Sequence, residues 1–252
     1  MVPFCVESSL SGIERPVGSD DKMIYRRNVD IPEQWMNKRL RLNFEAIDYS
    51  ATVLVNNKEV CSHTGGYDSF SCDISQLEGD SFELTLIVQD PTQTEAIPVG
   101  KQWAGQDRED VLKFIFYRST SGIWQSVWME PLEENSIEKV NITPLFDEAS
   151  LEILVTTTSS AEDNLDIEII EDEEVVLKTQ IQANSLSTIN LGDKFRAWSP
   201  ECPFLYDMRI SMPSSGDMVK TYFGMRKVEI RKDGNFQKIF LNNKELEFQV
   251  RQ

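Results

Sequence analysis

Apolar and polar residues alternate over short stretches through most of the chain. In residues 40–46, leucine, phenylalanine and alanine alternate with arginine, asparagine and glutamate, and residues 82–88 repeat the pattern. A period of two is typical of a strand that buries one face. The best candidate for an amphipathic helix covers only residues 108–115. The pattern therefore predicts a chain built almost wholly of strands.

Turn signals separate the predicted strands. Two asparagines at 56–57 lie between apolar runs and predict a tight hairpin, because asparagine tolerates positive φ. Two glycines at 65–66 mark a second turn. The Asp-Pro pair at 90–91 ends a strand and opens an irregular stretch that reaches about residue 113.

The alternating pattern stops at Pro131 and then restarts. Roughly seven short strands in about 90 residues are typical of an immunoglobulin-like sandwich. We therefore expect an all-β protein with two β-sandwich domains, residues 1–134 and 135–226, joined near residues 133–135. The strand-like segments after Pro131 are 137–143, 151–157, 165–170, 175–181 and 205–212.

Composition and charge narrow the classes of partner. The 252 residues include 42 acidic and 25 basic side chains, and the formal net charge is −17. This excess of acid argues against a nucleic-acid or anionic-membrane partner. No run of 18 apolar residues supports a membrane span. The first residues lack a signal-peptide pattern, so the compartment stays open: cytoplasmic, or periplasmic or secreted if an upstream signal was removed.

The cysteines do not form a metal-binding pattern. The chain has four cysteines, no C-x-x-C pair and a single histidine, His63, so we expect no metal site and no cofactor. Cys61 and Cys72 could pair if their strands were neighbours, but buried free thiols are the expected state of all four. We expect His63, which lies beside a turn, to make a structural hydrogen bond. Trp124 and Trp128 lie four apart, and we expect both to point from one strand into the core.

Segments along nearly the whole chain resemble, in the same order, the motifs of glycoside hydrolase family 2, the β-galactosidase and β-glucuronidase family. Residues 118–131, RSTSGIWQSVWMEP, resemble the segment that closes the family's sugar-binding domain. The other matching segments are VPFCVESSLSGI at 2–13, FEAIDYSATVLVN at 44–56, HTGGYDSF at 63–70, DPT at 90–92 with GKQ at 100–102, WSPECPFLY at 198–206, YFGMR at 222–226 and LNNK at 241–244.

The resemblance implies three parts and a function. Residues 1–134 resemble a jelly-roll, galactose-binding-like domain, residues 135–226 an immunoglobulin-like domain, and residues 227–252 the lead-in to a catalytic barrel that this chain does not contain. It implies a full-length retaining β-glycosidase acting on β-glycosides, β-galactosidase-like, with β-glucuronidase and β-mannosidase as alternatives. Two other readings stay open: a free-standing carbohydrate-binding module or lectin, and a scaffold whose exposed faces contact a barrel.

No catalytic residue is assigned. Retaining glycosidases use two carboxylates about 5 Å apart, and the family's acid/base glutamate follows an asparagine. No Asn-Glu dipeptide occurs in this sequence. We therefore expect these 252 residues alone to be inactive.

The long loop supplies the candidate sugar-binding residues. Lys101 and Gln102 offer hydrogen bonds beside the indole of Trp103, and such a set suits a pyranose, which has apolar faces and a rim of hydroxyls. Packing of this loop on a neighbouring domain or subunit explains the same residues equally well. Asp90 and Arg118 are further candidates, with a buried salt bridge as the alternative.

Overall fold

The structure, a computed structural model, describes residues 1–75, 77, 79–91, 94, 96–103, 117–160 and 163–246, and the side chains of all of these except Trp103 and Asp233. It divides into two compact units, Met1–Leu132 and Glu133–Gln252. The division falls two residues before the end of the first expected domain. The expected short helix at 108–115 lies outside the described residues.

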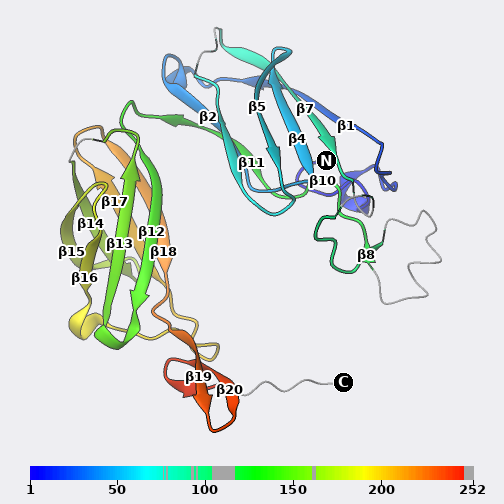
Figure 1. The fold of residues 1–252 in the computed structure, drawn as a ribbon. Helices are drawn as coiled ribbons and strands as arrows, with labels where there is room; N and C mark the ends of the chain where they lie inside the picture. The colour runs from blue at the N-terminus through cyan, green and yellow to red at the C-terminus, as the bar shows by residue number, and fades with distance from the viewer. Residues whose placement is uncertain are drawn as a thin grey trace. The chain divides into compact units, whose positions relative to one another are not determined.

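The first unit is a β-sandwich of two antiparallel sheets (Figure 1). The four-stranded sheet has the order β1-β7-β4-β5 and the three-stranded sheet has the order β11-β2-β6. Two short pairs lie at its loops: β3 (Ile47–Asp48) with β10 (Gly122–Ile123), and β8 (Gln102–Trp103) with β9 (Tyr117–Arg118). Short 3-10 turns cover Ser9–Ser11 and Glu33–Trp35. The sheet strands are β1 (Met23–Asp30), β2 (Arg39–Phe44), β4 (Ser50–Val55), β5 (Lys58–Thr64), β6 (Phe70–Asp73), β7 (Ser81–Gln89) and β11 (Val127–Leu132).

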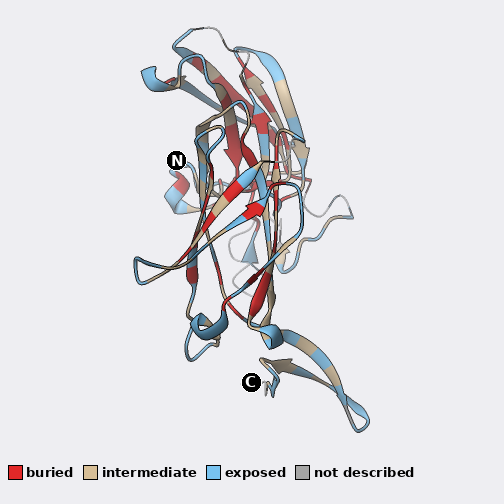
Figure 2. Ribbon diagram, turned by 90° about the vertical axis from the view of Figure 1, so that its left-hand side faces the viewer, coloured by how far each residue is buried: buried red, intermediate tan, exposed pale blue. Residues whose placement is uncertain are grey.

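Alternation along these strands builds the core between the two sheets. In β4 the buried positions are every second residue, and β2 and β7 follow the same rule over most of their length. Figure 2 shows the buried residues as bands along the strands. The expected hairpin joins β4 to β5, with Asn56 at φ 49° and Asn57 at φ 63°, so the asparagine signal for this turn is confirmed.

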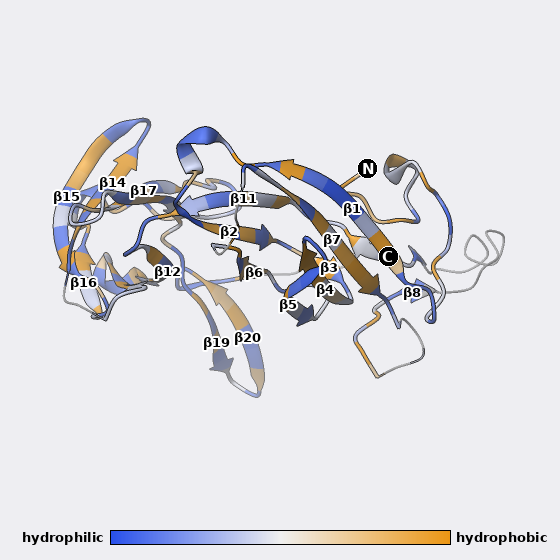
Figure 3. Cartoon of the chain, turned by 90° about the horizontal axis from the view of Figure 1, so that it is seen from above, coloured by the Kyte–Doolittle hydropathy of each residue, from blue (hydrophilic) through white to orange (hydrophobic). Residues whose placement is uncertain are grey.

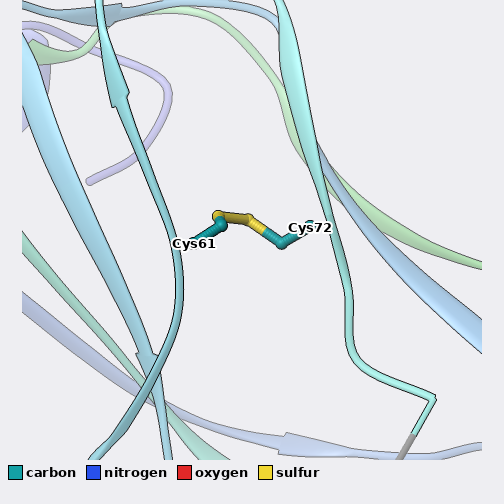
Figure 4. The surroundings of a disulfide bond; sticks show 2 residues. All are labelled: Cys61 and Cys72. Carbon is teal, nitrogen blue, oxygen red and sulfur yellow. A yellow bond between two sulfur atoms is a disulfide. The ribbon is translucent and has the colours of Figure 1, made fainter.

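The expectation of four free thiols is wrong, because Cys61 and Cys72 form a disulfide (Figure 4). Cys61 lies on β5 and Cys72 on β6, which are edge strands of the two opposite sheets. Their Cα atoms are 5.8 Å apart, within the usual range for a bridge. Periodicity within a strand cannot reveal a pairing between sheets. Cys5 and Cys202 are free, the first half-buried and the second exposed.

The second unit contains another β-sandwich, with a three-stranded sheet β12-β13-β16 against a four-stranded sheet β15-β14-β17-β18. Its core is apolar, and Leu151, Ile153 and Val155 on one sheet and Leu165 and Ile167 on the other are 0% exposed. Short 3-10 turns cover Phe146–Glu148 and Gly192–Lys194. The strands are β12 (Ile137–Leu145), β13 (Ser150–Thr157), β14 (Asn164–Glu171), β15 (Glu174–Gln182), β16 (Ser187–Asn190), β17 (Tyr206–Met212) and β18 (Asp217–Phe223).

A separate small sheet follows this sandwich, made of β19 (Val228–Asp233), β20 (Phe236–Leu241) and β21 (Lys244–Glu245). Its turn is tied to the sandwich by two asparagines. Asn242 Nδ2 donates to the Trp198 carbonyl at 2.8 Å, and Asn243 Nδ2 donates to Asp147 Oδ1 at 2.7 Å. These two hydrogen bonds therefore attach the turn between β20 and β21 to the sandwich.

We predict that loss of the Cys61–Cys72 bridge destabilises the first unit. The two cysteines are 11 residues apart in sequence, and cross-linking a loop of about this size contributes about 3 kcal/mol in the loop-entropy model. Urea unfolding of the oxidised protein, the dithiothreitol-treated protein and Cys61→Ala should show that loss. Cys202→Ala is the control and should unfold like the wild type. Detection of four alkylatable thiols in the unreduced protein would contradict the structure.

Candidate functional site

The loop that carries the candidate sugar-binding residues begins where β7 ends and returns at β9. Within this loop, the parallel pair of β8 and β9 brings residues 102–103 beside residues 117–118, and Tyr117 N donates to the Lys101 carbonyl at 2.8 Å. Residues 104–116, between the two strands, lie outside the described residues. Gln102 and the backbone of Trp103 therefore lie on β8 beside Tyr117 and Arg118, and Lys101 directly precedes this strand.

The candidates differ in what they contact. Lys101 is exposed and Gln102 is half-buried. The side-chain carbonyl of Gln102 accepts a hydrogen bond from Thr120 N at 2.8 Å, which fixes this amide against the segment after β9. The side chain of Trp103 lies outside the described residues. Lys101 is thus exposed to solvent, whereas Gln102 would have to break its hydrogen bond with Thr120 to turn toward a ligand.

Asp90 and Arg118 lie in different environments. Asp90 is 2% exposed, and its Oδ2 accepts a hydrogen bond from the Ser121 hydroxyl at 2.6 Å. Arg118, on β9, is exposed. The two therefore do not form the buried salt bridge considered from the sequence, and the structure gives Asp90 a partner within its own unit.

Two further carboxylates are buried near Asp90. Glu7 and Asp48 are each 6% exposed, and Glu7 Oε2 accepts a hydrogen bond from Ser121 N at 3.0 Å. Ser121 therefore joins Glu7 to Asp90 through its backbone and its hydroxyl. Burial, and then the neighbouring charges of Asp90 and Glu7, raises the pKa of Asp48 from 3.8 to about 7. Burial also raises the pKa of Glu7 above its ordinary range.

The glycine signals explain how the backbone fits around Asp48. A Cβ on Gly66 would lie 2.7 Å from the Asp48 carboxyl group, so only glycine fits there. Gly65 and Gly122 have φ angles of +137° and +88°, which suit glycine. Sequence reasoning did not single out Glu7 or Asp48. Each lies inside a quoted motif, but no neighbouring residue in sequence signals that the carboxylates meet.

Among the described residues, His63 has no hydrogen bond of the structural kind expected from the sequence. Its ring stacks on Phe70 with centroids 4.3 Å apart, and Phe70 in turn stacks on Phe44 at 4.8 Å. The Nε2 atom of His63 is buried without a partner among the described residues. Its place in the fold therefore comes from aromatic packing.

The expectation that Trp124 and Trp128 both point into the core is also wrong. Trp124 lies in the segment between β10 and β11, where the chain leaves the strand, so the two-residue period does not carry through to Trp128. Trp124 Nε1 donates to the Gly66 carbonyl at 2.8 Å, and Tyr67, which is 64% exposed, packs edge-on against its ring. Trp128 is 43% exposed.

Two searches of the described residues found nothing: one for a metal-binding group and one for a membrane-spanning helix. Within the ranges that the structure describes, no group of three or more His, Cys, Asp or Glu side chains is arranged to hold a metal ion. No helix in the same ranges has the length and apolar character needed to cross a membrane.

Comparisons with known proteins cover both units. The family model described as "Glycosyl hydrolases family 2, sugar binding domain" matches residues 12–130, and the model described as "Glycosyl hydrolases family 2" matches residues 135–226. The crystal structure of Ruminococcus gnavus β-glucuronidase aligns with a TM-score of 0.72 and 20% identity, covering 98% of this chain and 42% of that chain. At this identity the likeness concerns the fold alone, and it agrees with two β-sandwiches.

Curated relatives are longer proteins. A β-galactosidase of Thermoanaerobacter pseudethanolicus is 26% identical over 228 residues, which cover 84% of this chain and 29% of the relative. A β-glucuronidase of Bacteroides fragilis is 29% identical over 251 residues, which cover 92% of this chain and 34% of the relative. This chain thus spans about a third of their length. Since the two family models together match most of both units, the protein belongs to glycosyl hydrolase family 2, of which it carries the sugar-binding domain and the β-sandwich that follows.

Proposed function

We propose that this chain is the non-catalytic N-terminal part of a retaining β-glycosidase with β-galactosidase-like specificity. Its relatives include enzymes named β-galactosidase and β-glucuronidase. We prefer β-galactosidase because we take it to be the commoner activity in the family. β-Glucuronidase is the nearest alternative, followed by β-mannosidase. In the whole enzyme the two sandwiches position a catalytic barrel and form part of its wall.

The observation that carries the proposal is an exposed apolar face on the β19–β20 hairpin. Val228 faces Leu241 and Ile230 faces Ile239 across the ladder, so these four side chains share one face. Val228 is 62% exposed, Ile230 is 67% exposed and Ile239 is 37% exposed. Figure 3 shows the hydrophobic residues along this hairpin. A face of this kind marks a surface that another element covers, which supports contact between residues 227–246 and a barrel.

The loop of Lys101 and Trp103 is the part that we assign to sugar contact. It presents Lys101 in an exposed position and holds Gln102 against Thr120. Arg118 is exposed on the neighbouring strand β9. We propose that these groups line the mouth of the active site, while Asp90 holds the base of the loop through Ser121.

A free-standing carbohydrate-binding module is the second candidate. The observation that favours it is the exposed ring of Tyr67, held edge-on by Trp124. Exposed aromatic rings are suitable platforms for the apolar face of a sugar. This site and the Trp103 loop can be separated by substitution.

We infer that the buried carboxylates Glu7, Asp48 and Asp90 serve the fold and not catalysis. Two of them are hydrogen-bonded to the same serine, and all three are almost fully buried. For Asp48 the raised pKa means that folding favours its protonated form. The unfolded chain releases this proton near pH 4 and the folded chain near pH 7, so this contribution to stability is full below about pH 4 and is lost as the pH rises to about 7.

We predict that the purified chain releases no nitrophenol from aryl β-galactoside, β-glucuronide or β-mannoside substrates. A retaining reaction needs one carboxylate as acid/base and a second as nucleophile. Neither carboxylate is identified in this sequence. A longer product of the same gene that includes the barrel should turn over the galactoside. Turnover by the 252-residue chain that disappears when one of its own acids is substituted would contradict the proposal.

We predict weak sugar binding, with a millimolar Kd, or roughly −4 kcal/mol. One wall of a site leaves most of the ligand in water, whereas complete pockets bury about 70–90% of a ligand. Galactose and lactose titrations followed by amide shifts should show loss of binding in Trp103→Ala and no change in the matched variant Tyr67→Ala. Micromolar binding that survives Trp103→Ala and is lost in Tyr67→Ala would favour the binding-module alternative.

We predict that Asp48→Asn flattens the pH dependence of stability between pH 4 and 7 and that the variant is more stable than the wild type above pH 7. A pKa displaced from 3.8 to about 7 sets an upper limit of about 4 kcal/mol, and solvent screening reduces it. Urea unfolding at several pH values measures the effect. Asp193→Asn, at an exposed position, is the control. A wild type whose stability rises from pH 4 to 7 through this group would refute the assignment.

A further inference from the structure

The carboxylate of Asp147 holds two separate parts of the small sheet that follows the second sandwich. Asp147 lies in the 3-10 turn Phe146–Glu148, between β12 and β13. Its Oδ2 accepts a hydrogen bond from Lys227 Nζ at 2.5 Å, and its Oδ1 accepts one from Asn243 Nδ2 at 2.7 Å. Lys227 directly precedes β19, and Asn243 lies between β20 and β21. One side chain of the sandwich therefore reaches both the beginning of the hairpin and the turn that follows it.

The residues around Asp147 are also joined to one another. Lys227 N donates to Asn242 Oδ1 at 3.0 Å, and Asn242 N donates to the Lys227 carbonyl at 2.9 Å. The hydrogen bond from Lys227 holds the pKa of Asp147 below its ordinary value, so this carboxylate is ionised at neutral pH. Charge-assisted hydrogen bonds within such a network orient their partners better than one isolated surface ion pair.

Apolar packing does not fix this hairpin on the sandwich. The buried core of the second unit includes no described residue after Met225. On β19 and β20, Val228, Ile230 and Phe236 are 62%, 67% and 73% exposed. The direction of the hairpin therefore depends on the polar contacts at its base.

Those contacts come from two places on the sandwich. The first is Trp198, whose carbonyl accepts a hydrogen bond from Asn242 Nδ2 at 2.8 Å and whose N–H donates to the Met225 carbonyl at 2.9 Å. Because the chain enters the hairpin just after Met225, this contact lies beside the covalent connection. A body attached at one place can still rotate about it. Asp147 belongs to a different segment and supplies the second place, which restricts that rotation.

We propose that Asp147 is a positioning residue that sets the direction of the β19–β20 hairpin against the second sandwich. The apolar face that includes Val228, Ile230 and Ile239 is then offered to the catalytic barrel in one orientation. This inference rests on the proposed function, because it assigns that face to the barrel. A carboxylate outside the hairpin, with a side chain that is 52% exposed, thereby controls how the sandwich meets the barrel.

The test measures how the hairpin moves in the whole 252-residue chain. Residual dipolar couplings of the amides in β19 and β20 are compared with those of β13 in the same sample. In the wild type, one alignment should fit both sets, because the hairpin and the sandwich tumble as one body. In Asp147→Ala the hairpin couplings should fall about twofold, since a segment that reorients by itself averages its couplings. The melting temperature of the sandwich should not change, because exposed ion pairs contribute little to stability.

Two further variants separate positioning by Asp147 from a general effect of lost charge. Asp193→Ala removes an exposed aspartate from the 3-10 turn Gly192–Lys194 of the same unit and should leave all couplings unchanged. Asn243→Gly removes one partner of Asp147 and keeps the positive φ of 66° at this position. It should reproduce part of the loss and add nothing to Asp147→Ala, because both act through one network. Unchanged hairpin couplings in Asp147→Ala, or an equal loss in Asp193→Ala, would overturn the proposal.

A longer product of the same gene, with the barrel, tests the consequence for activity. Asp147→Ala should raise KM for the galactoside about fivefold and leave kcat within about twofold, because the sandwiches contribute to substrate binding and not to the reacting groups. An unchanged KM would overturn the positioning role. A longer product without turnover would refute the proposed function, whereas the dipolar couplings of the shorter chain would still decide the role of Asp147.

Discussion

Each unit depends on the burial of one face of every long strand between two sheets. In the second unit, Ile153 and Ile167 come from opposite sheets and are both fully buried. Removal of such a side chain from water contributes about 1.5–3 kcal/mol, while the strands alone bury too little to be stable. A slip by one residue would turn the buried set toward solvent. The registers of β2, β4 and β13 therefore determine which of their side chains enter the core.

The fold could be predicted because its main signal is local. The two-residue period in residues 40–46 and 82–88 became β2 and β7, and the asparagine pair at 56–57 became a hairpin with positive φ. The period failed at Trp124 and Trp128, because the chain bends between β10 and β11 and the pattern assumes an unbroken strand. A two-residue period predicts which face of an unbroken strand is buried. It predicts nothing for residues beyond the end of that strand.

The site was less predictable, because it depends on residues distant in sequence. Glu7 and Asp90 meet through Ser121, and Cys61 meets Cys72 between sheets. Neither contact follows from periodicity or composition. The candidate residues Lys101 and Gln102 came from a motif, and the structure adds that Gln102 is held by Thr120. Motif resemblance thus located the loop, and only the structure shows that Gln102 has a partner there.

The position of the disulfide has a mechanical consequence. A covalent link between β5 and β6 holds the two sheets at one edge, whereas no disulfide joins the described residues near β1 and β11. Separation of the sheets therefore resembles rotation about an axis along the bridged edge. Displacement grows with distance from that axis, so local opening of this kind is expected to expose the amide protons of β1 and β11 more than those near the bridge. The disulfide therefore restricts the opening of the sandwich to the edge that is farther from β5 and β6.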